Sequence, residues 1–277
     1  MDTAVTQLPA LTPDAIGPSA TEERVWERIW RHRPSDAKDD MLLAQERSGL
    51  RWELIVRHAE AAFGSIRGLR TIEIGSGRGD LSVLLARDGA DVTLLDQSAK
   101  ALDEARRRFD RLRLDARRES GDMLGRLDKW SGRFDVSLSS GVIEHFRGSD
   151  RLRAVRAHLD VLRPGGLAII SVPHSRCPPY RIWKAYLQIR GWWPYGVEVP
   201  YSRREIETLA SASGLVDIET QCYGFWRSIG NLWGKDVFKR DVDWTDRRSR
   251  LDGLMGMNLL LFARRPGSTM TENALNR

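Results

Sequence analysis

A glycine-rich segment directly after an apolar run constrains this chain more than any other feature. Residues 71–80 read Thr-Ile-Glu-Ile-Gly-Ser-Gly-Arg-Gly-Asp. Alternate glycines permit a tight turn whose backbone approaches a ligand, and a helix that begins just after it favours a negative group. A nicotinamide-type fingerprint would place its third glycine at position 80, which is Asp80 here. The segment therefore predicts a strand, a ligand-binding turn and a helix, and disfavours a dinucleotide site.

Strand-like and helical segments alternate from residue 70 onward. The β-like runs lie at residues 70–74, 91–96, 134–139, 167–172, 216–221 and 257–263. The amphipathic stretches lie at residues 80–87, 99–112, 151–162 and 203–213. This alternation predicts βαβ units and a parallel sheet. We expect one α/β domain over residues 67–265.

The segments on either side of this region differ from it. Two stretches at residues 21–33 and 41–63 carry apolar side chains at helical spacing. They predict two N-terminal helices within residues 21–66. Residues 1–20 and 266–277 lack any periodicity, so we expect mobile tails at both ends.

Two carboxylates follow the second and third predicted strands. Asp96 comes about 20 residues after the first glycines, where an acid accepts hydrogen bonds from ribose hydroxyls. Asp122 and Met123 lie in a turn after a short predicted strand at residues 114–118. An acid there can accept from an adenine amine while the methionine packs on the ring. Aspartate is also a common turn former, and that alternative stays open for Asp122.

Together these segments resemble the class I S-adenosylmethionine-dependent methyltransferases, in particular the small-molecule group that includes ubiquinone and menaquinone biosynthesis methyltransferases. The likeness covers about residues 70–173, including residues 134–146, which resemble the family's fourth-strand motif, and residues 162–166, which resemble the turn before its fifth strand. It implies S-adenosylmethionine as cofactor and a Rossmann-like α/β fold: a seven-stranded sheet with an antiparallel last strand and helices on both faces. The implied cofactor-binding residues are Glu73, Gly75, Ser76, Gly77, Gly79, Asp96, Gln97, Asp122, Met123 and Ser139.

Candidate catalytic residues follow the fourth and fifth predicted strands, at the edge where ligands bind in open α/β folds. Glu144 and His145 come first, and this histidine can act as a general base on a hydroxyl or can brace the next helix. His174 can face the acceptor or lie in a solvated loop. Some quinone O-methyltransferases bind a divalent metal through Glu-x-x-Glu-His. Gly141 replaces the first glutamate here, so we expect no metal.

Residues 173–202 interrupt the alternation with five prolines and many aromatic residues. We expect an inserted cap or lid, because aromatic walls with polar tips suit an apolar or planar acceptor. The core of an ordinary subdomain is the alternative. The candidate substrate contacts are Tyr180, Trp183, Trp192, Trp193, Tyr201 and Trp226. Basic residues mixed among these aromatics would also suit peripheral contact with a membrane if the acceptor is lipid-linked.

Composition narrows the compartment and the partners. Two cysteines are too few for a disulfide framework, and no apolar stretch approaches the ~18 residues of a membrane span, so we expect a cytoplasmic protein. The net charge is +6, but the 44 basic residues are scattered rather than clustered, so nucleic acid is not expected as a partner. A homo-oligomer through the N-terminal helices is compatible with the sequence.

The function predicted is methyl transfer from S-adenosylmethionine to a small-molecule acceptor, apolar or aromatic, at oxygen. Carbon methylation of an isoprenoid or aromatic natural product is the nearest alternative, because an aromatic pocket can stabilise a cation. Methylation of RNA or protein is permitted by the basic pI of about 9.6. A cofactor-binding module without catalysis is the non-enzymatic alternative.

Overall fold

The computed structural model describes residues 26, 29–30, 34–233 and 248–267. The tail predicted at residues 1–20 and nearly all of the one predicted at 266–277 lie outside the described residues. Of the first predicted helix, at residues 21–33, the three described positions are helical.

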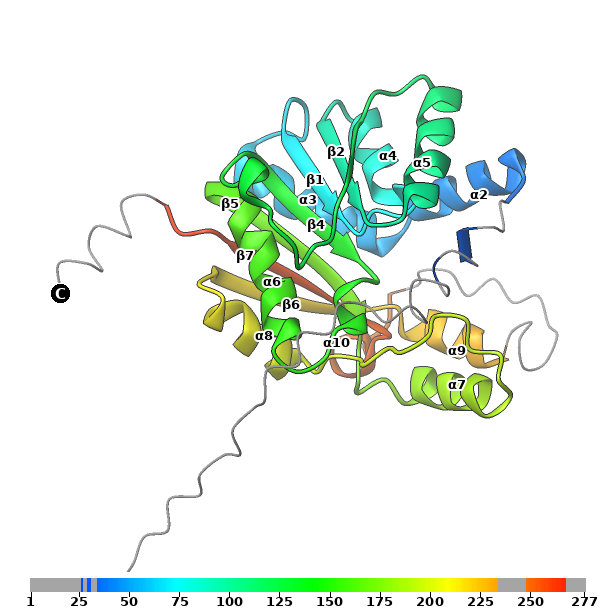
Figure 1. Ribbon diagram of the computed structural model, residues 1–277. Coiled ribbons are helices and arrows are strands. Elements are labelled where there is room, and N and C mark those ends of the chain that lie inside the picture. Colours follow the sequence, from blue (N-terminus) through cyan, green and yellow to red (C-terminus); the bar gives the residue numbers. More distant parts are fainter. Residues whose placement is uncertain (1–25, 27–28, 31–33, 234–247, 268–277) are drawn as a thin grey trace, which may run out of the picture.

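The described residues form one seven-stranded sheet in the order β3-β2-β1-β4-β5-β7-β6 (Figure 1). Its strands are β1 Arg70–Ile74, β2 Asp91–Asp96, β3 Arg117–Ser120, β4 Phe134–Ser140, β5 Leu162–Pro173, β6 Val216–Tyr223 and β7 Asn258–Arg264. Strands β1 to β5 pair in parallel, whereas β7 runs antiparallel to both of its neighbours. The predicted Rossmann-like sheet with an antiparallel last strand is confirmed.

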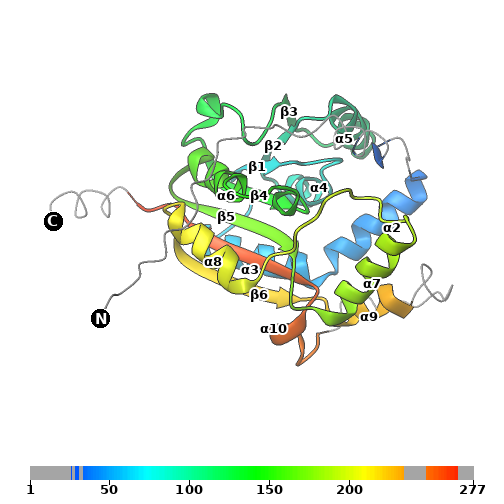
Figure 2. The same ribbon diagram turned by 60° about the horizontal axis from the view of Figure 1, so that its bottom comes forward.

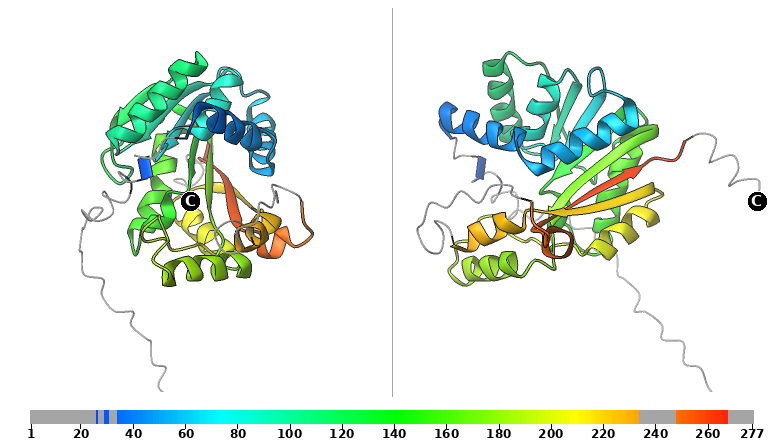
Figure 3. Two further views of the ribbon diagram at one scale, coloured as in Figure 1. Left: turned by 90° about the vertical axis from the view of Figure 1, so that its right-hand side faces the viewer. Right: turned by 180° about the vertical axis from the view of Figure 1, so that it is seen from behind.

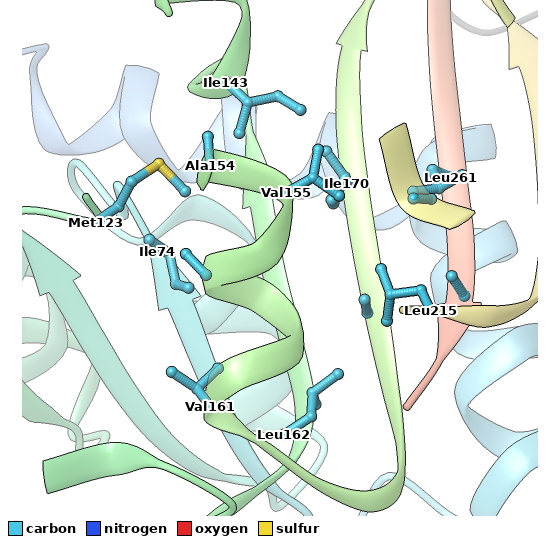
Figure 4. Packing of buried hydrophobic residues seen from close by; sticks show 14 of the residues in the cluster. Ile74, Met123, Ile143, Ala154, Val155, Val161, Leu162, Ile170, Leu215 and Leu261 are labelled. Carbon is cyan, nitrogen blue, oxygen red and sulfur yellow. The ribbon is translucent and has the colours of Figure 1, made fainter. Parts of the chain in front are cut away.

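Helices cover both faces of this sheet. The helices are α2 Asp36–Arg47, α3 Leu50–Phe63, α4 Asp80–Arg87, α5 Ala99–Leu112, α6 Asp150–Val161, α7 Pro178–Ile189, α8 Arg203–Ala212, α9 Phe225–Trp233 and α10 Asp252–Met255. Helices α2 to α5 share one apolar cluster with the sheet, and α6 and α8 share the other. Figure 4 shows Ala154, Val155 and Val161 of α6 beside Ile74 and Ile170 of the strands. None of the described helices is long and apolar enough to cross a bilayer.

Strand β5 shows why these runs become buried parallel strands. Successive side chains of a strand point to opposite faces, so a strand covered on both faces is apolar throughout. Leu167 and Ile169 belong to the cluster under α3 and α4, while Ala168 and Ile170 belong to the cluster under α6. Because β1, β2, β4 and β5 run parallel to one another, their carboxyl ends lie at the same edge of the sheet.

The structure differs from the expected elements at three places. The helix expected at residues 41–63 is two helices, because Ser48 ends α2 and Gly49 caps α3 in an extended conformation. The turn expected at 162–166 is an irregularity inside β5, where the pairing shifts between Phe134 and Val136 of β4. The third strand lies at Arg117–Ser120 rather than at 114–118.

The region expected to form a cap contains α7 and a long loop. Two prolines occupy the first turn of α7, where a missing N–H costs nothing. Helix α9 packs beside α7, and the two lie together below the sheet (Figures 1 and 2). Seen from behind, this pair is well separated from α4 and α5 (Figure 3). The structure thus consists of the sheet with its covering helices and, beside it, the pair formed by α7 and α9.

Candidate active site

The glycine turn between β1 and α4 allows no side chain at two of its positions. Gly75, Gly77 and Gly79 have φ values of 68°, 52° and 69°, in the region that side-chain-bearing residues avoid. A Cβ on Gly75 would lie 2.7 Å from Val142, and one on Gly77 would lie 2.5 Å from the Trp30 ring. The predicted turn therefore needs glycine for its conformation and for the space around it.

Asp96 lies at the end of β2, directly beside this turn. Its Oδ2 accepts a hydrogen bond from the Gly77 amide at 2.8 Å, and its Oδ1 accepts one from the Ser98 amide at 2.8 Å. Burial raises the pKa of Asp96, and these amide hydrogen bonds oppose that shift. Each carboxylate oxygen can accept a further hydrogen bond, so Asp96 retains capacity for a ligand's hydroxyls. Gln97, the next residue, is exposed.

Ser76 supplies the clearest sign that a polar ligand belongs in the turn. Its side chain is 6% exposed, and its hydroxyl is buried without a hydrogen-bond partner among the described residues. Buried polar groups are nearly always paired, so an orphaned hydroxyl inside a glycine turn is expected where a ligand is absent. The residues present therefore fit a cofactor with polar groups at this edge.

Two predicted cofactor contacts direct their side chains into the protein instead. Glu73 accepts hydrogen bonds from the amide of Ser82 in α4 at 3.1 Å and from its hydroxyl at 2.5 Å. Burial raises the pKa of Glu73 to about 7. The Ser139 hydroxyl lies 3.0 Å from Nε2 of His158 in α6. The structure thus makes Glu73 a support for α4, and its Ser139 side chain contacts α6.

The turn after β3 holds the remaining predicted cofactor residues. Asp122 is exposed, and its Oδ1 accepts a hydrogen bond from the Leu124 amide at 2.9 Å. This contact is the turn-forming role that the sequence left open, and the exposed carboxylate keeps further acceptor capacity. Met123 is 6% exposed and lies in the apolar cluster beside Ile74 (Figure 4). Its side chain is therefore largely part of the core.

Glu144 and His145 lie in a short 3₁₀ turn, Ile143–His145, just after β4. Glu144 is 2% exposed, its Oε2 has no partner among the described residues, and burial raises its pKa to about 8. The Nδ1 atom of His145 lies 2.6 Å from the carbonyl oxygen of Val197. A carbonyl only accepts, so Nδ1 carries the hydrogen and Nε2 holds the lone pair of the neutral ring.

Glu198 joins these two residues from the region expected to form a cap. Ligand atoms of Glu144, His145 and Glu198 all lie within 4.8 Å of one another, an arrangement that can hold a metal ion. Glu198 is already paired, because Lys184 donates to its Oε1 at 3.1 Å and the Tyr180 hydroxyl donates to the same oxygen. Sequence reasoning missed Glu198 because it is distant along the chain from the Glu-His pair.

His174 is placed differently from His145. It is 2% exposed, and its Nδ1 lies 3.1 Å from the carbonyl oxygen of Gly256, just before β7. Its backbone amide donates to Met257 at 2.8 Å. Burial lowers the pKa of His174. These contacts give His174 a bracing role between β5 and the segment before β7, whereas His145 is attached to the loop after α7.

The six aromatic residues expected to contact substrate differ in burial: the two tyrosines are buried, and the four tryptophans are more accessible. Tyr201 is fully buried, its hydroxyl donates to the carbonyl of Ile143 at 3.1 Å, and the Arg151 guanidinium lies 3.5 Å from its ring centroid. Tyr180 is 2% exposed. Both therefore serve as structural contacts, which is the subdomain-core alternative. Both tyrosines can be buried because their hydroxyl groups form hydrogen bonds inside the protein.

The tryptophans of this region are more accessible. Trp183 and Trp193 contact each other edge to face at 5.4 Å, and Trp226 lies 5.4 Å from Phe225. Trp192 is 51% exposed. Ile182 and Ile189 of α7 are exposed as well, and the predicted contact with a membrane stays a prediction.

Sequence reasoning also missed three residues contributed by the N-terminal helices. Arg51 of α3 donates to the Ser140 hydroxyl at 2.6 Å, at the end of β4. Trp26 lies 4.9 Å from His145, ring centroid to ring centroid, and Trp30 contacts the glycine turn. The helical spacing of the tryptophans was visible in the sequence, but nothing in it indicated what they would cover.

Comparison with known proteins agrees with this geometry. Residues 72–166 match a methyltransferase-domain family. The chain is 29% identical over 208 residues to a ubiquinone biosynthesis O-methyltransferase of Sinorhizobium medicae, covering 73% of this chain and 75% of the relative. It is 39% identical over 106 residues to the protein of the same name from Ruegeria pomeroyi, covering 38% of this chain and 41% of that protein.

Solved structures show the same fold. A structure on the conversion of a disulfide bond into a thioacetal group during echinomycin biosynthesis has 25% identity and a TM-score of 0.52, covering 79% of this chain and 84% of its own. Magnesium protoporphyrin IX methyltransferase from Synechocystis PCC 6803 with bound S-adenosylhomocysteine has 17% identity and a TM-score of 0.56, covering 89% and 95%. The methyltransferase-domain match, these relatives, the glycine turn, Asp96 and the sheet order together support a class I S-adenosylmethionine-dependent methyltransferase.

Proposed function

We propose that this methyltransferase methylates a hydroxyl oxygen of a small apolar or aromatic acceptor. The observation that carries the proposal is the orientation of His145, whose Nδ1 donates to Val197 and whose Nε2 holds the basic lone pair. It lies at the sheet edge that carries the glycine turn and Asp96. The O-methyltransferase names of the similar proteins support oxygen as the acceptor atom.

The cofactor contacts in this proposal come from one edge of the sheet. Asp96 accepts hydrogen bonds from the ribose hydroxyls with the acceptor capacity left on its two oxygens. The orphaned Ser76 hydroxyl binds the amino-acid end. The exposed carboxylate of Asp122 accepts from the adenine amine. Glu73 acts as a positioning residue through Ser82 and does not touch the ligand.

S-adenosylmethionine supplies an activated methyl group on a sulfonium sulfur, so the protein needs mainly to align the acceptor and to take its proton. A bound cofactor would give its methyl group to the acceptor oxygen and leave as S-adenosylhomocysteine. The hydroxyl proton passes to Nε2 of His145. The Val197 carbonyl stabilises the imidazolium, because it accepts the hydrogen bond from Nδ1.

We propose His145 rather than His174 as the base. Nδ1 of His174 makes the same kind of contact, to the Gly256 carbonyl, but this ring is only 2% exposed, whereas His145 is half-buried, and burial lowers the pKa of His174 from its ordinary value. The predicted absence of a metal requirement also remains part of the proposal. Lys184 already brings a positive charge to Glu198, which is the contact that a cation would otherwise supply to this carboxylate.

The experiment combines binding with product analysis. Titration calorimetry with S-adenosylhomocysteine tests the cofactor site, with NAD as the comparison ligand. Incubation with methyl-labelled S-adenosylmethionine and a set of phenols and catechols then tests the acceptor, and NMR of the product separates an O-methyl from a C-methyl group. A C-methyl product would overturn the oxygen assignment in favour of carbon methylation. Stronger binding of NAD would overturn the cofactor assignment.

A further inference from the structure

Trp30, from the N-terminal segment, lies directly against the glycine turn. Two atoms of its six-membered ring lie 2.5 and 2.8 Å from the place where a Cβ on Gly77 would be. The amide of Gly77 is the same group that donates to Asp96. The indole therefore covers the backbone that presents the ribose-binding carboxylate, and it is itself half-buried.

Trp26 continues this contact to the other end of the site. Its ring stacks on Trp30 with the centroids 6.5 Å apart and the planes at 21°. It also meets the His145 imidazole edge to face, at 4.9 Å and 89°. Both separations lie in the range where aromatic rings attract one another. An unbroken row of rings thus leads from the cofactor turn to the candidate base.

We propose that Trp26 and Trp30 form the aromatic wall of the active site, with Trp30 packing on the bound cofactor and Trp26 positioning His145. The inference rests on the proposed function. Trp30 is then a binding residue, because it covers the turn in which the cofactor lies. Trp26 is a positioning residue, because it acts through the imidazole.

Three aromatic residues of the region 173–202 are engaged elsewhere or lie outward. Tyr201 is fully buried with its hydroxyl on Ile143, and Tyr180 is bonded to Glu198. Trp192 is half exposed beside Arg190, on the outer end of α7. By contrast, Trp26 and Trp30 each contact a residue that the proposed chemistry uses. An acceptor bound at His145 would lie near the Trp26 ring, which favours a planar or apolar acceptor.

The test of Trp30 measures cofactor affinity in the full-length chain. We expect Trp30→Ala to raise the S-adenosylhomocysteine Kd about five- to tenfold, since an aromatic contact contributes on this scale, and Trp30→Phe to change it less than about twofold. Tryptophan fluorescence should change on titration of the wild type and lose part of that change in Trp30→Phe. Ile29→Ala, next to it in the same helical segment, is the matched control and should stay within about twofold.

Trp26 is tested by separating binding from turnover. Trp26→Ala should lower kcat about fivefold and leave the S-adenosylhomocysteine Kd within about twofold, with Trp26→Phe restoring most of the rate. An unchanged Kd in Trp30→Ala, or an equal loss in Ile29→Ala, would overturn the proposed wall while the cofactor assignment stands. If the wild type itself binds no S-adenosylhomocysteine, the proposed function falls and this inference falls with it.

Discussion

The glycine turn and the cap, here meaning α7 with the loop up to residue 202, are held together by different kinds of contact. In the turn, backbone amides make the bonds: those of Gly75 and Ser76 both donate to the Leu95 carbonyl, at 2.8 and 3.1 Å. In the cap, buried side chains make them: Lys184 donates to the Glu198 carbonyl at 2.6 Å and lies 5.0 Å from the Trp193 ring centroid. Substitutions in the turn should therefore matter most at its glycines and at Asp96. Substitutions in the cap should matter most at its charged and aromatic side chains.

The largest expected effect falls between the two regions, at His145. His145→Gln should lower kcat about 100- to 1000-fold, because a general base contributes on this scale. The S-adenosylhomocysteine Kd should change less than twofold, since the glycine turn is untouched. The comparison variant is His174→Gln, measured in the same steady-state assay and expected to keep kcat within about tenfold. A greater loss in His174→Gln than in His145→Gln would reverse the assignment of the base.

Because the cap contains a buried ion pair, removing one of its partners should cost much stability. The side chains of Lys184 and Glu198 are only 8% and 7% exposed. Removing the ammonium leaves the buried Glu198 carboxylate with the Tyr180 hydroxyl but without this opposite charge, so Lys184→Met should lower the free energy of unfolding by about 2 to 4 kcal/mol. Denaturant titration measures this loss.

A surface ion pair provides the control for that measurement. Arg126 and Asp128 are 92% and 74% exposed, so Arg126→Ala should change stability by less than about 0.5 kcal/mol. Equal losses in the two variants would mean that burial of the pair in the cap has no energetic weight, which would remove the contrast between cap and turn.

The acid beside the turn predicts a loss of binding rather than of folding. Asp96→Ala leaves the Gly77 and Ser98 amides and the ribose hydroxyls without an acceptor. We expect S-adenosylhomocysteine binding to weaken by about 1 to 3 kcal/mol, the usual penalty for unpaired polar groups. Calorimetry on this variant and on Asp115→Ala, a carboxylate outside the site, checks the assignment. Unchanged affinity in Asp96→Ala would exclude Asp96 as a ligand-binding residue.

The difference between the two regions also explains how much the sequence could predict. The helices at Asp80–Arg87 and Ala99–Leu112 and the strand at Asp91–Asp96 agree residue by residue with their predicted spans. Their boundaries depend on local signals, such as Gly79 before α4 and the Ser98 cap of α5. Periodicity and capping are properties of neighbouring residues, so a sequence displays them directly.

Contacts between distant segments are not displayed in that way. Glu198 reaches the Glu144–His145 pair across the fold, and Trp26 reaches His145 from the N-terminal segment. Tyr201 is a residue type that often lines substrate pockets, yet its hydroxyl donates a hydrogen bond to the Ile143 carbonyl inside the core. Composition indicates where aromatic residues gather, but only tertiary packing decides which rings face a ligand.

Glu144 predicts a pH dependence of stability with a definite sign. Its pKa in the folded protein is about 8, above the ordinary value of 4.5, because burial penalises the charged form. The folded state binds this proton more tightly, so the stabilising effect is complete below pH 4.5 and is lost as pH rises through 8. Glu144→Gln cannot ionise. Its unfolding free energy should therefore exceed that of the wild type by about 3 to 5 kcal/mol at pH 9 and match it near pH 4.5.

Chemical denaturation at several pH values measures this difference. The exposed residue Glu60, replaced by Gln, is the control and should show no such trend. A Glu144→Gln curve parallel to that of the wild type would mean that the buried carboxyl does not titrate in this range.

The smallest expected effect concerns metal ions, where cap and catalytic turn meet. Glu144, His145 and Glu198 are close enough to hold a cation. Lys184 already donates to Glu198, and its charge also opposes the rise that burial causes in the pKa of Glu144. A divalent ion would have to bind beside this ammonium, at a Coulombic cost that is large in a poorly solvated site.

Turnover with excess chelator should therefore stay within about twofold of turnover with added Mg²⁺ or Mn²⁺, a change below about 0.5 kcal/mol in the barrier. A loss of turnover in chelator that Mg²⁺ restores would show that the cation, rather than Lys184, completes the cluster. Lys184→Met gives the sharper form of the test, because removing the ammonium should increase Mn²⁺ affinity at these three ligands if the lysine occupies the cation's place.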